Sequence, residues 1–124
     1  MKKGELYHLE SKQCSAKLGA IEDALYAIGG KWRLRIIIAL LEGDKRFNEI
    51  QRTVRGISPK VLSHELKELE LNGFVKRNVF STATPVVVEY EGTEYSLTLT
   101  KVLDALIEWG AAHREKIKEI PVQR

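Results

Sequence analysis

Polar side chains recur on one side of a segment near the middle of the chain. Lys60, Ser63, His64 and Lys67 share one face of a helix at about 100° per residue, and Ser58 stands just before it. Hydroxyl, imidazole and ammonium groups can reach base edges or phosphates. This pattern is typical of a helix that enters the major groove of DNA. An ordinary solvated surface helix is the alternative when the segment is taken alone.

Both ends of this helix carry residues with known end preferences. Ser58 can accept a hydrogen bond from a first-turn amide, and Pro59 suits the first helical position because its missing N–H would be unpaired there. Gly73 can adopt the left-handed conformation that ends a helix. The opposite face carries an apolar stripe for a core, formed by Leu62, Leu66 and Leu69.

The composition indicates one folded domain. The chain has 124 residues, of which 44% are hydrophobic and 30% charged, and this balance argues against disorder. No apolar run is long enough to cross a bilayer, and the polar N-terminus lacks the apolar stretch of a signal peptide. We therefore expect a cytoplasmic protein with no membrane partner.

Positive charge is concentrated in the middle of the chain, although the formal net charge is only +3. Residues 31 to 80 contain 11 Lys and Arg against 6 Asp and Glu. Residues 1 to 30 have 4 of each sign, and residues 81 to 124 have 5 basic and 7 acidic residues. A basic centre between neutral or acidic ends is typical of a polyanion-binding site.

Catalytic and metal-binding patterns are weak in this sequence. The single cysteine, Cys14, has no partner for an internal disulfide and no nearby histidine along the chain. His8, His64 and His113 are too scattered for metal-ligand spacing. We therefore predict no metal, no cofactor and no enzyme activity. Cys14 keeps two interpretations, a redox sensor or a small buried apolar residue.

The first part of the chain predicts an arm followed by two helices. Residues 1 to 13 lack periodicity and are expected to form a mobile arm, so the folded domain would span residues 14 to 120. A helix is predicted from Ser15 to Ile28, where Gly29 ends it. Residues 31 to 41 are so apolar that they predict a buried helix.

A short third helix and a hairpin frame the polar helix. Asn48 is predicted to cap the short helix, and residues 45 to 47 could form a brief strand. The short helix, a tight turn and the polar helix make a helix-turn-helix arrangement. Residues 74 to 91 predict a β-hairpin, the wing, with Lys76 and Arg77 at its base. The predicted fold class is α+β, mainly α, a winged helix-turn-helix with N- and C-terminal dimerisation helices.

The two terminal helices carry more apolar surface than a small core needs. The last helix is predicted over residues 94 to 119, with Pro121 to stop it. Apolar surface of this extent most economically indicates a second copy of the chain, and a core that absorbs both helices is the alternative. The residues expected at the dimer interface are Leu18, Ile21, Leu25, Leu103, Leu106, Trp109, Gly110 and Ile117.

Several ordered motifs together resemble the HxlR-type bacterial transcription regulators, which are related to the MarR group. The motifs lie within residues 14 to 112 and include Gly29-Gly30-Lys31-Trp32, Lys45-Arg46-Phe47-Asn48-Glu49-Ile50, Gly56-Ile57-Ser58-Pro59-Lys60-Val61-Leu62, Leu66-Lys67-Glu68-Leu69 and Asn72-Gly73-Phe74-Val75-Lys76-Arg77. The resemblance implies a homodimer that binds double-stranded DNA at an inverted-repeat operator and responds to a redox, electrophile or metabolite signal. Residues 91 to 96 depart from the family's usual joint into the last helix, so we expect a looser joint here.

The leading hypothesis is a homodimeric DNA-binding regulator whose effector is a small molecule or an oxidant. A winged-helix protein-interaction module without DNA binding is the alternative, because Glu65, Glu68 and Glu70 leave the polar helix nearly neutral. The residues expected to contact DNA are Arg46, Ser58, Pro59, Lys60, Ser63, His64, Lys67, Lys76 and Arg77, and Cys14 is the candidate redox sensor.

Overall fold

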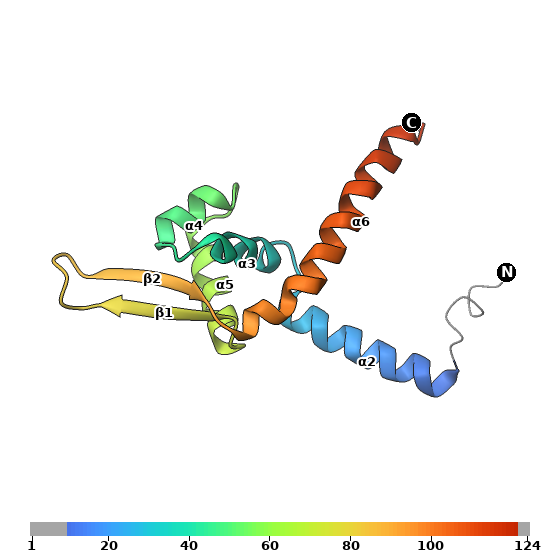
Figure 1. Cartoon of the computed structure of the whole chain (residues 1–124), viewed down its shortest axis with the longest axis horizontal. Helices are drawn as coiled ribbons and strands as arrows, with labels where there is room; N and C mark the ends of the chain where they lie inside the picture. Colours follow the sequence, from blue (N-terminus) through green and yellow to red (C-terminus); the bar gives the residue numbers. More distant parts are fainter. Residues whose placement is uncertain (1–9, 122–124) are drawn as a thin grey trace.

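The computed structural model describes residues 10 to 121. Two long helices flank the helix-turn-helix body in the chain and extend from one side of it, while a two-stranded hairpin projects from the other side (Figure 1). The helices are α2 (Ser11–Ile28), α3 (Arg33–Glu42), α4 (Phe47–Thr53), α5 (Pro59–Leu71) and α6 (Thr100–Glu119), with the 3-10 helix η1 (Tyr95–Leu99) just before α6. The strands are β1 (Val75–Phe80) and β2 (Val87–Gly92).

The hairpin is antiparallel and its base is attached to the helical body. Val75 pairs with Gly92 at the base. An isolated bridge joins Lys45 to Tyr90 of β2, where each backbone N–H donates to the other carbonyl oxygen at 3.0 and 2.7 Å. The predicted wing is therefore present. The brief strand predicted at residues 45 to 47 is reduced to this single bridge.

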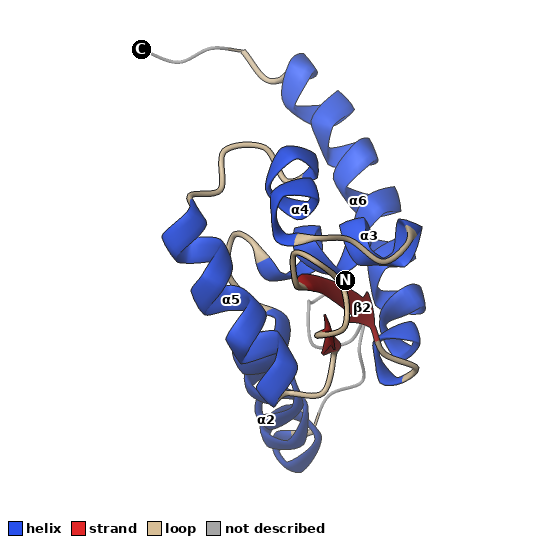
Figure 2. Ribbon diagram, turned by 90° about the vertical axis from the view of Figure 1, so that its left-hand side faces the viewer, coloured by secondary structure: helices blue, strands red, loops and turns tan. Residues whose placement is uncertain are grey.

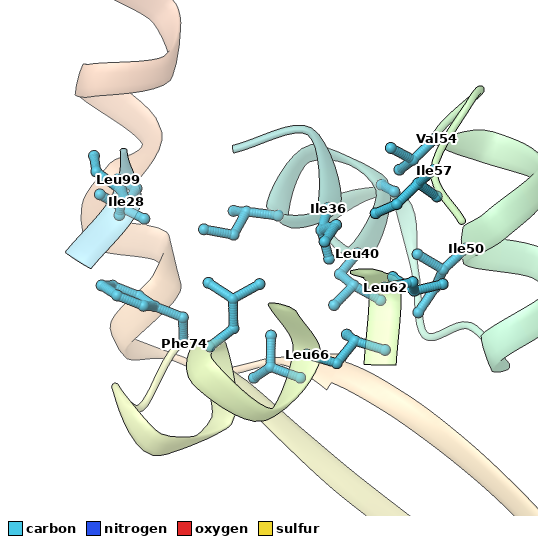
Figure 3. Close-up of a cluster of buried hydrophobic side chains, with 14 of the residues drawn as sticks. Ile28, Ile36, Leu40, Ile50, Val54, Ile57, Leu62, Leu66, Phe74 and Leu99 are labelled. Atoms are coloured by element: carbon cyan, nitrogen blue, oxygen red, sulfur yellow. The ribbon is translucent and has the colours of Figure 1, made fainter. Parts of the chain in front are cut away.

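The core lies where α3, α4 and α5 meet the base of the hairpin (Figure 3). Its side chains come from all three helices, so the short helices depend on tertiary packing more than on their own propensity. The predicted leucine stripe of α5 is confirmed, and its burial determines which face of α5 points outward. The most buried large apolar side chains are Ile36, Ile37, Ile50, Leu62, Leu66 and Leu69.

Truncating Leu62 to alanine is expected to destabilise the fold by about 2 to 5 kcal/mol, because it removes a fully buried side chain and leaves a cavity. Denaturation in urea measures this change. Val61→Ala is the matched control, since Val61 lies next to Leu62 on α5 but is exposed, and its effect should stay within roughly 0.5 kcal/mol. Equal losses in the two variants would contradict the burial pattern of α5.

The helix boundaries differ from prediction at several ends. α2 begins at Ser11, four residues before the predicted Ser15, because Glu10 and Gln13 form a capping box in which the Glu10 N–H donates to the Gln13 side chain at 3.1 Å. The predicted mobile arm is thus helical from Ser11, and its residues 1 to 9 lie outside the described residues. Apolar periodicity could not locate this start, since Leu18 is the first large apolar residue of the helix.

The helices of the central body are also shifted by one or two residues. α3 runs from Arg33 to Glu42 instead of 31 to 41. α4 begins at Phe47, so Asn48 is not its cap; Arg46 occupies that position and its N–H donates to the Glu49 carboxylate at 3.0 Å. The hydrogen bond from the Arg46 backbone N–H to the Glu49 side chain therefore takes the place of the predicted Asn48 cap.

Side-chain hydrogen bonds and a ring contact hold the joint into the last helix, and the prediction that it is looser than the family's usual joint stays a prediction. The Thr93 hydroxyl donates to the Gly73 carbonyl at 2.6 Å, and the Ser96 hydroxyl donates to the Thr93 carbonyl. The Tyr95 ring stacks on Phe74 with 5.1 Å between centroids. These contacts place the 3-10 helix η1 between the hairpin and α6, where one continuous helix was predicted. α6 then ends at Glu119, ahead of Pro121 as predicted.

Candidate nucleic-acid interface

The start and end of α5 are built as the sequence predicted. The Ser58 hydroxyl accepts a hydrogen bond from the Val61 N–H at 3.2 Å, and Pro59 is the first helical residue. Gly73 follows the helix with φ of +82°, a conformation in which a side chain would be strained. Both ends hold α5 as one rigid element next to the wing.

The outward face of α5 is polar and open to solvent. Since the leucine stripe turns into the core, the opposite side is free to meet a partner. All of the α5 residues predicted to contact DNA are exposed, namely Pro59, Lys60, Ser63, His64 and Lys67, and so is Ser58 just before the helix. Because these side chains are exposed, they can contact a duplex, and their polar groups are not needed for the packing of the core.

The wing base adds a basic residue to this face. A hollow of about 410 Å³ separates α5 from the hairpin and is lined by Ser63, Leu66, Lys67, Glu70, Arg77 and Tyr90. Predicted contact residues from two distant segments, Lys67 and Arg77, therefore meet at one surface. Lys76 is exposed on β1 one residue earlier, and it pairs in register with Glu91 of β2.

Arg46 lies in a different place from the other predicted contact residues. It lines a second hollow of about 570 Å³ together with Asp44, Asn48, Glu49, Arg52 and Glu89. The three carboxylates in this set reduce the local positive potential. Arg46 is exposed, but the hollow between α5 and the wing base does not include it. Arg52, which the sequence reasoning passed over, is a further cation beside it.

Glu65 does not neutralise the outward face in the way the sequence suggested. Its carboxylate accepts a hydrogen bond from the Arg33 Nε at 2.7 Å, and each side chain is only 16% exposed. The charge of Glu65 is therefore compensated from within the protein. This removes one of the three acids on which the protein-interaction alternative depended.

Lys45 is paired with an acid of the helix that precedes it. Its ammonium donates to the Glu42 carboxylate at 2.7 Å, and the Lys45 side chain is 12% exposed. This hydrogen bond, together with the positive charge of Lys45, lowers the pKa of the exposed Glu42 carboxyl. The cations of α5 and of the wing base, by contrast, are exposed.

The predicted dimer residues lie on helices that extend away from the body. α2 and α6 leave the helix-turn-helix in different directions, and α6 lies on the side opposite α5 (Figures 1 and 2). Leu103 is the exception: it is 5% exposed and belongs to the core, so it is withdrawn from the predicted interface. The remaining predicted interface residues are exposed, namely Leu18, Ile21, Leu25, Leu106, Trp109, Gly110 and Ile117.

Cys14 is exposed on the first turn of α2 in the single chain. Its two interpretations, a redox sensor or a small apolar residue, both stay predictions. Within residues 10 to 121 no three potential ligands are grouped to hold a metal ion. In the same part of the chain no helix combines the length and apolar character needed to cross a membrane.

A helix-turn-helix with an exposed polar second helix and an adjoining hairpin is a winged helix-turn-helix. The chain belongs to the HxlR-like helix-turn-helix family, which residues 27 to 118 match. The family is one of transcriptional regulators that bind DNA through the helix-turn-helix. The resemblance inferred from the motifs is therefore confirmed.

Three relatives illustrate this membership. The HTH-type transcriptional regulator YtcD of Bacillus subtilis is 40% identical over 98 residues, covering 79% of this chain and 77% of YtcD. The redox regulator HypR in its reduced form is 36% identical with a TM-score of 0.74, covering 82% of this chain and 99% of HypR. The quinone-bound YodB from B. subtilis is 36% identical with a TM-score of 0.64, covering 76% of this chain and 98% of YodB.

Proposed function

We propose that this regulator binds an inverted-repeat operator as a homodimer. The observation that carries the proposal is the exposed polar face of α5 joined at one surface to the basic base of the wing. In this arrangement α5 enters the major groove, Lys76 and Arg77 hold phosphates, and the loop at residues 81 to 86 reaches the neighbouring minor groove.

The dimer follows from the apolar surface of the two terminal helices. Large apolar side chains such as Leu25 and Trp109 are 62% and 64% exposed, and surface of this kind is favoured at interfaces between copies. A two-fold dimer brings two copies of α5 to the same side of a duplex. The two recognition helices would then lie about 34 Å apart, one turn of DNA.

Selection of bound duplexes from a random library by the purified protein tests this function. The expected result is an inverted repeat with half-site centres about 10 base pairs apart. A folded dimer that enriches no sequence, and that also fails to bind random duplexes at low salt, would refute DNA binding. It would then favour a winged-helix module that contacts other proteins.

The signal proposed for this regulator is an oxidant or electrophile that reacts at Cys14. Support comes from the exposure of Cys14 at the far end of α2 and from the likeness to HypR, a redox regulator, and to YodB in a quinone-bound form. Since the chain has one cysteine, the oxidised product is either a disulfide between two copies of Cys14 or a mixed disulfide with a small thiol. A non-covalent metabolite is the other class of effector.

Replacing Cys14 with serine is expected to abolish the response to oxidant while leaving operator binding of the reduced protein unchanged. The change removes only the thiol of an exposed side chain, so the fold should not be affected. Operator affinity is measured before and after diamide for both proteins. If Cys14→Ser loses DNA binding on diamide treatment as the parent does, Cys14 is not the sensor. The effect of candidate metabolites on operator binding by the reduced protein would then be measured.

A further inference from the structure

The direction of α2 is determined at its C-terminal end. Of its side chains only Ile28 is buried, and those from Ser11 to Tyr26 lie along the solvent-exposed part of the helix. In Figure 1 α2 extends away from the body, and no other helix of the described residues runs alongside it. Lateral packing within one chain therefore cannot hold the helix in place, and its orientation depends on the joint to α3.

This joint contains two consecutive glycines. Gly29 is the C-cap of α2, and Gly30 follows with φ of +92°, where glycine meets no steric penalty. A Cβ on Gly29 would come too close to the Leu25 carbonyl, so the cap also requires glycine. A two-glycine joint is conformationally permissive. A further contact is therefore needed to fix the angle between α2 and α3.

Arg33 makes the contacts that can lock it. Its Nη1 donates to the carbonyl oxygens of Tyr26 and Ala27 in the last turn of α2, at 2.9 and 3.1 Å. These carbonyls are among the last four of the helix, which have no helical partner, and a cation there is favoured by the helix dipole. The same guanidinium donates from Nε to Glu65 at 2.7 Å.

One planar side chain thus connects the end of α2 to the middle of α5. A guanidinium presents its N–H groups in a rigid fork, so its bonds on the two sides are geometrically coupled. The side chains of Arg33 and Glu65 are each 16% exposed, so water screens their attraction weakly. Loss of either partner would leave the other charge largely buried and unpaired.

We infer that Arg33 is a positioning residue that sets the direction of α2 relative to α5, and thereby the distance between the two recognition helices of a dimer. The inference rests on the proposed dimeric DNA binding for its consequence, but its structural part concerns a single chain. Glu65 lies within α5 close to Ser63 and His64, which face outward. Movement of α2 would therefore be transmitted to the face that contacts DNA.

Distances between spin labels test the structural part directly. One label is attached to the native Cys14 on α2 and the other to an introduced cysteine, Thr53→Cys, at the exposed end of α4. Labelled chains are diluted with unlabelled Cys14→Ser chains so that distances within one chain dominate. The expected result is one narrow distribution, which broadens or shifts in Arg33→Met. If Arg33→Met does not fold, the same distance distribution is measured in Arg33→Lys.

Two further variants separate positioning from simple stabilisation. Arg35→Met is the matched control, because Arg35 lies on the same helix but its guanidinium rests over the Trp32 ring. The exchange Arg33→Glu with Glu65→Arg restores the attraction between α3 and α5 but places a carboxylate near the carbonyls of α2. We expect this exchange to recover resistance to urea without recovering the narrow distance distribution. Recovery of both, or no change in Arg33→Met, would overturn the inference.

The functional part is measured with selected operators whose two half-sites are moved apart by one or two base pairs. Couplings between sites typically amount to about 5- to 150-fold. The parent is expected to prefer the selected spacing by about tenfold or more, and Arg33→Met by about threefold or less. An undiminished preference in the variant would refute the link to spacing. If the parent binds no duplex at all, the proposed function fails, while the label distances still decide the role of Arg33.

Discussion

Replacing both Lys60 and Lys67 with alanine is expected to weaken operator binding about 100-fold or more. Loss of one base-reading side chain costs roughly 1 to 3 kcal/mol, loss of a phosphate contact weakens binding to every sequence, and a homodimer loses both lysines from each copy. Both side chains are exposed, and the ion pairs of the described residues do not include them. Their removal should therefore leave the free energy of unfolding unchanged. Fluorescence anisotropy with a labelled operator measures the affinity.

The salt dependence of the same titration separates two roles for these lysines. Log affinity against log salt has a slope of about −0.9 for each phosphate neutralised, so loss of a phosphate contact makes the slope shallower by about that amount. Loss of a base contact instead relaxes the sequence preference at one operator position. The position of Lys67 in the hollow beside Arg77 favours a phosphate contact.

Lys116→Ala with Lys118→Ala is the matched control for this variant. The pair removes the same net charge, and both lysines are exposed near the end of α6, a helix that extends away from the body (Figure 1). A general effect of net charge on association would weaken both double variants equally. A specific contact surface on α5 would leave the control close to the parent. Equal losses would mean that α5 is not the recognition helix.

The features that the sequence predicted well are those written in local residue patterns. Ser58, Pro59 and Gly73 act within one or two turns of the helix ends, so the ends of α5 could be placed without any tertiary information. The leucine stripe and the hairpin depend on periodicities of 3.6 and 2, which are likewise local. The polar face of α5 follows, since it is the complement of the stripe.

The features that escaped prediction depend on tertiary contacts. Arg33 and Glu65 are 32 positions apart, and no local pattern indicates that they meet. The Tyr95 ring stacks on Phe74 across the joint, which turned a predicted helix start into the 3-10 helix η1. Leu103 shares the helical stripe of α6 with Leu106, but periodicity cannot tell where along that stripe the body ends. Only the packed structure separates the core residue from the exposed one.

Arg33 also changes the electrostatic reading of the recognition helix. From sequence alone, Glu65 is expected to cancel the charge of a lysine on the polar face, which weakens the case for a polyanion partner. In the structure its partner is a cation of another helix, so the outward lysines keep their charge for a ligand. The same ion pair that anchors α5 in the fold therefore also adjusts the charge of its outward face. The Arg33–Glu65 ion pair thus affects both the position of α5 and the electrostatic potential of its outward face.

Either Leu25→Glu or Leu106→Glu is expected to convert the protein to a monomer. A carboxylate placed in an apolar interface loses its hydration without gaining a partner, so the cost falls on association and not on the fold of the exposed helix. The two residues lie on different helices and are 62% and 48% exposed, which makes their effects independent tests of the interface. Sedimentation velocity measures the oligomeric state across protein concentrations.

Loss of the dimer should strongly reduce affinity for the whole operator but leave affinity for a single half-site unchanged. The affinity of two linked half-site contacts exceeds that of a single contact by about 10²- to 10⁴-fold, and a monomer loses that gain. Affinity for an isolated half-site should stay as in the parent, because α5 and the wing are unchanged. Leu71→Glu is the control for the assembly state: Leu71 is 81% exposed at the end of α5, so the same type of substitution there should leave the dimer intact. If Leu25→Glu and Leu106→Glu both stay dimeric, the copies do not associate through α2 and α6.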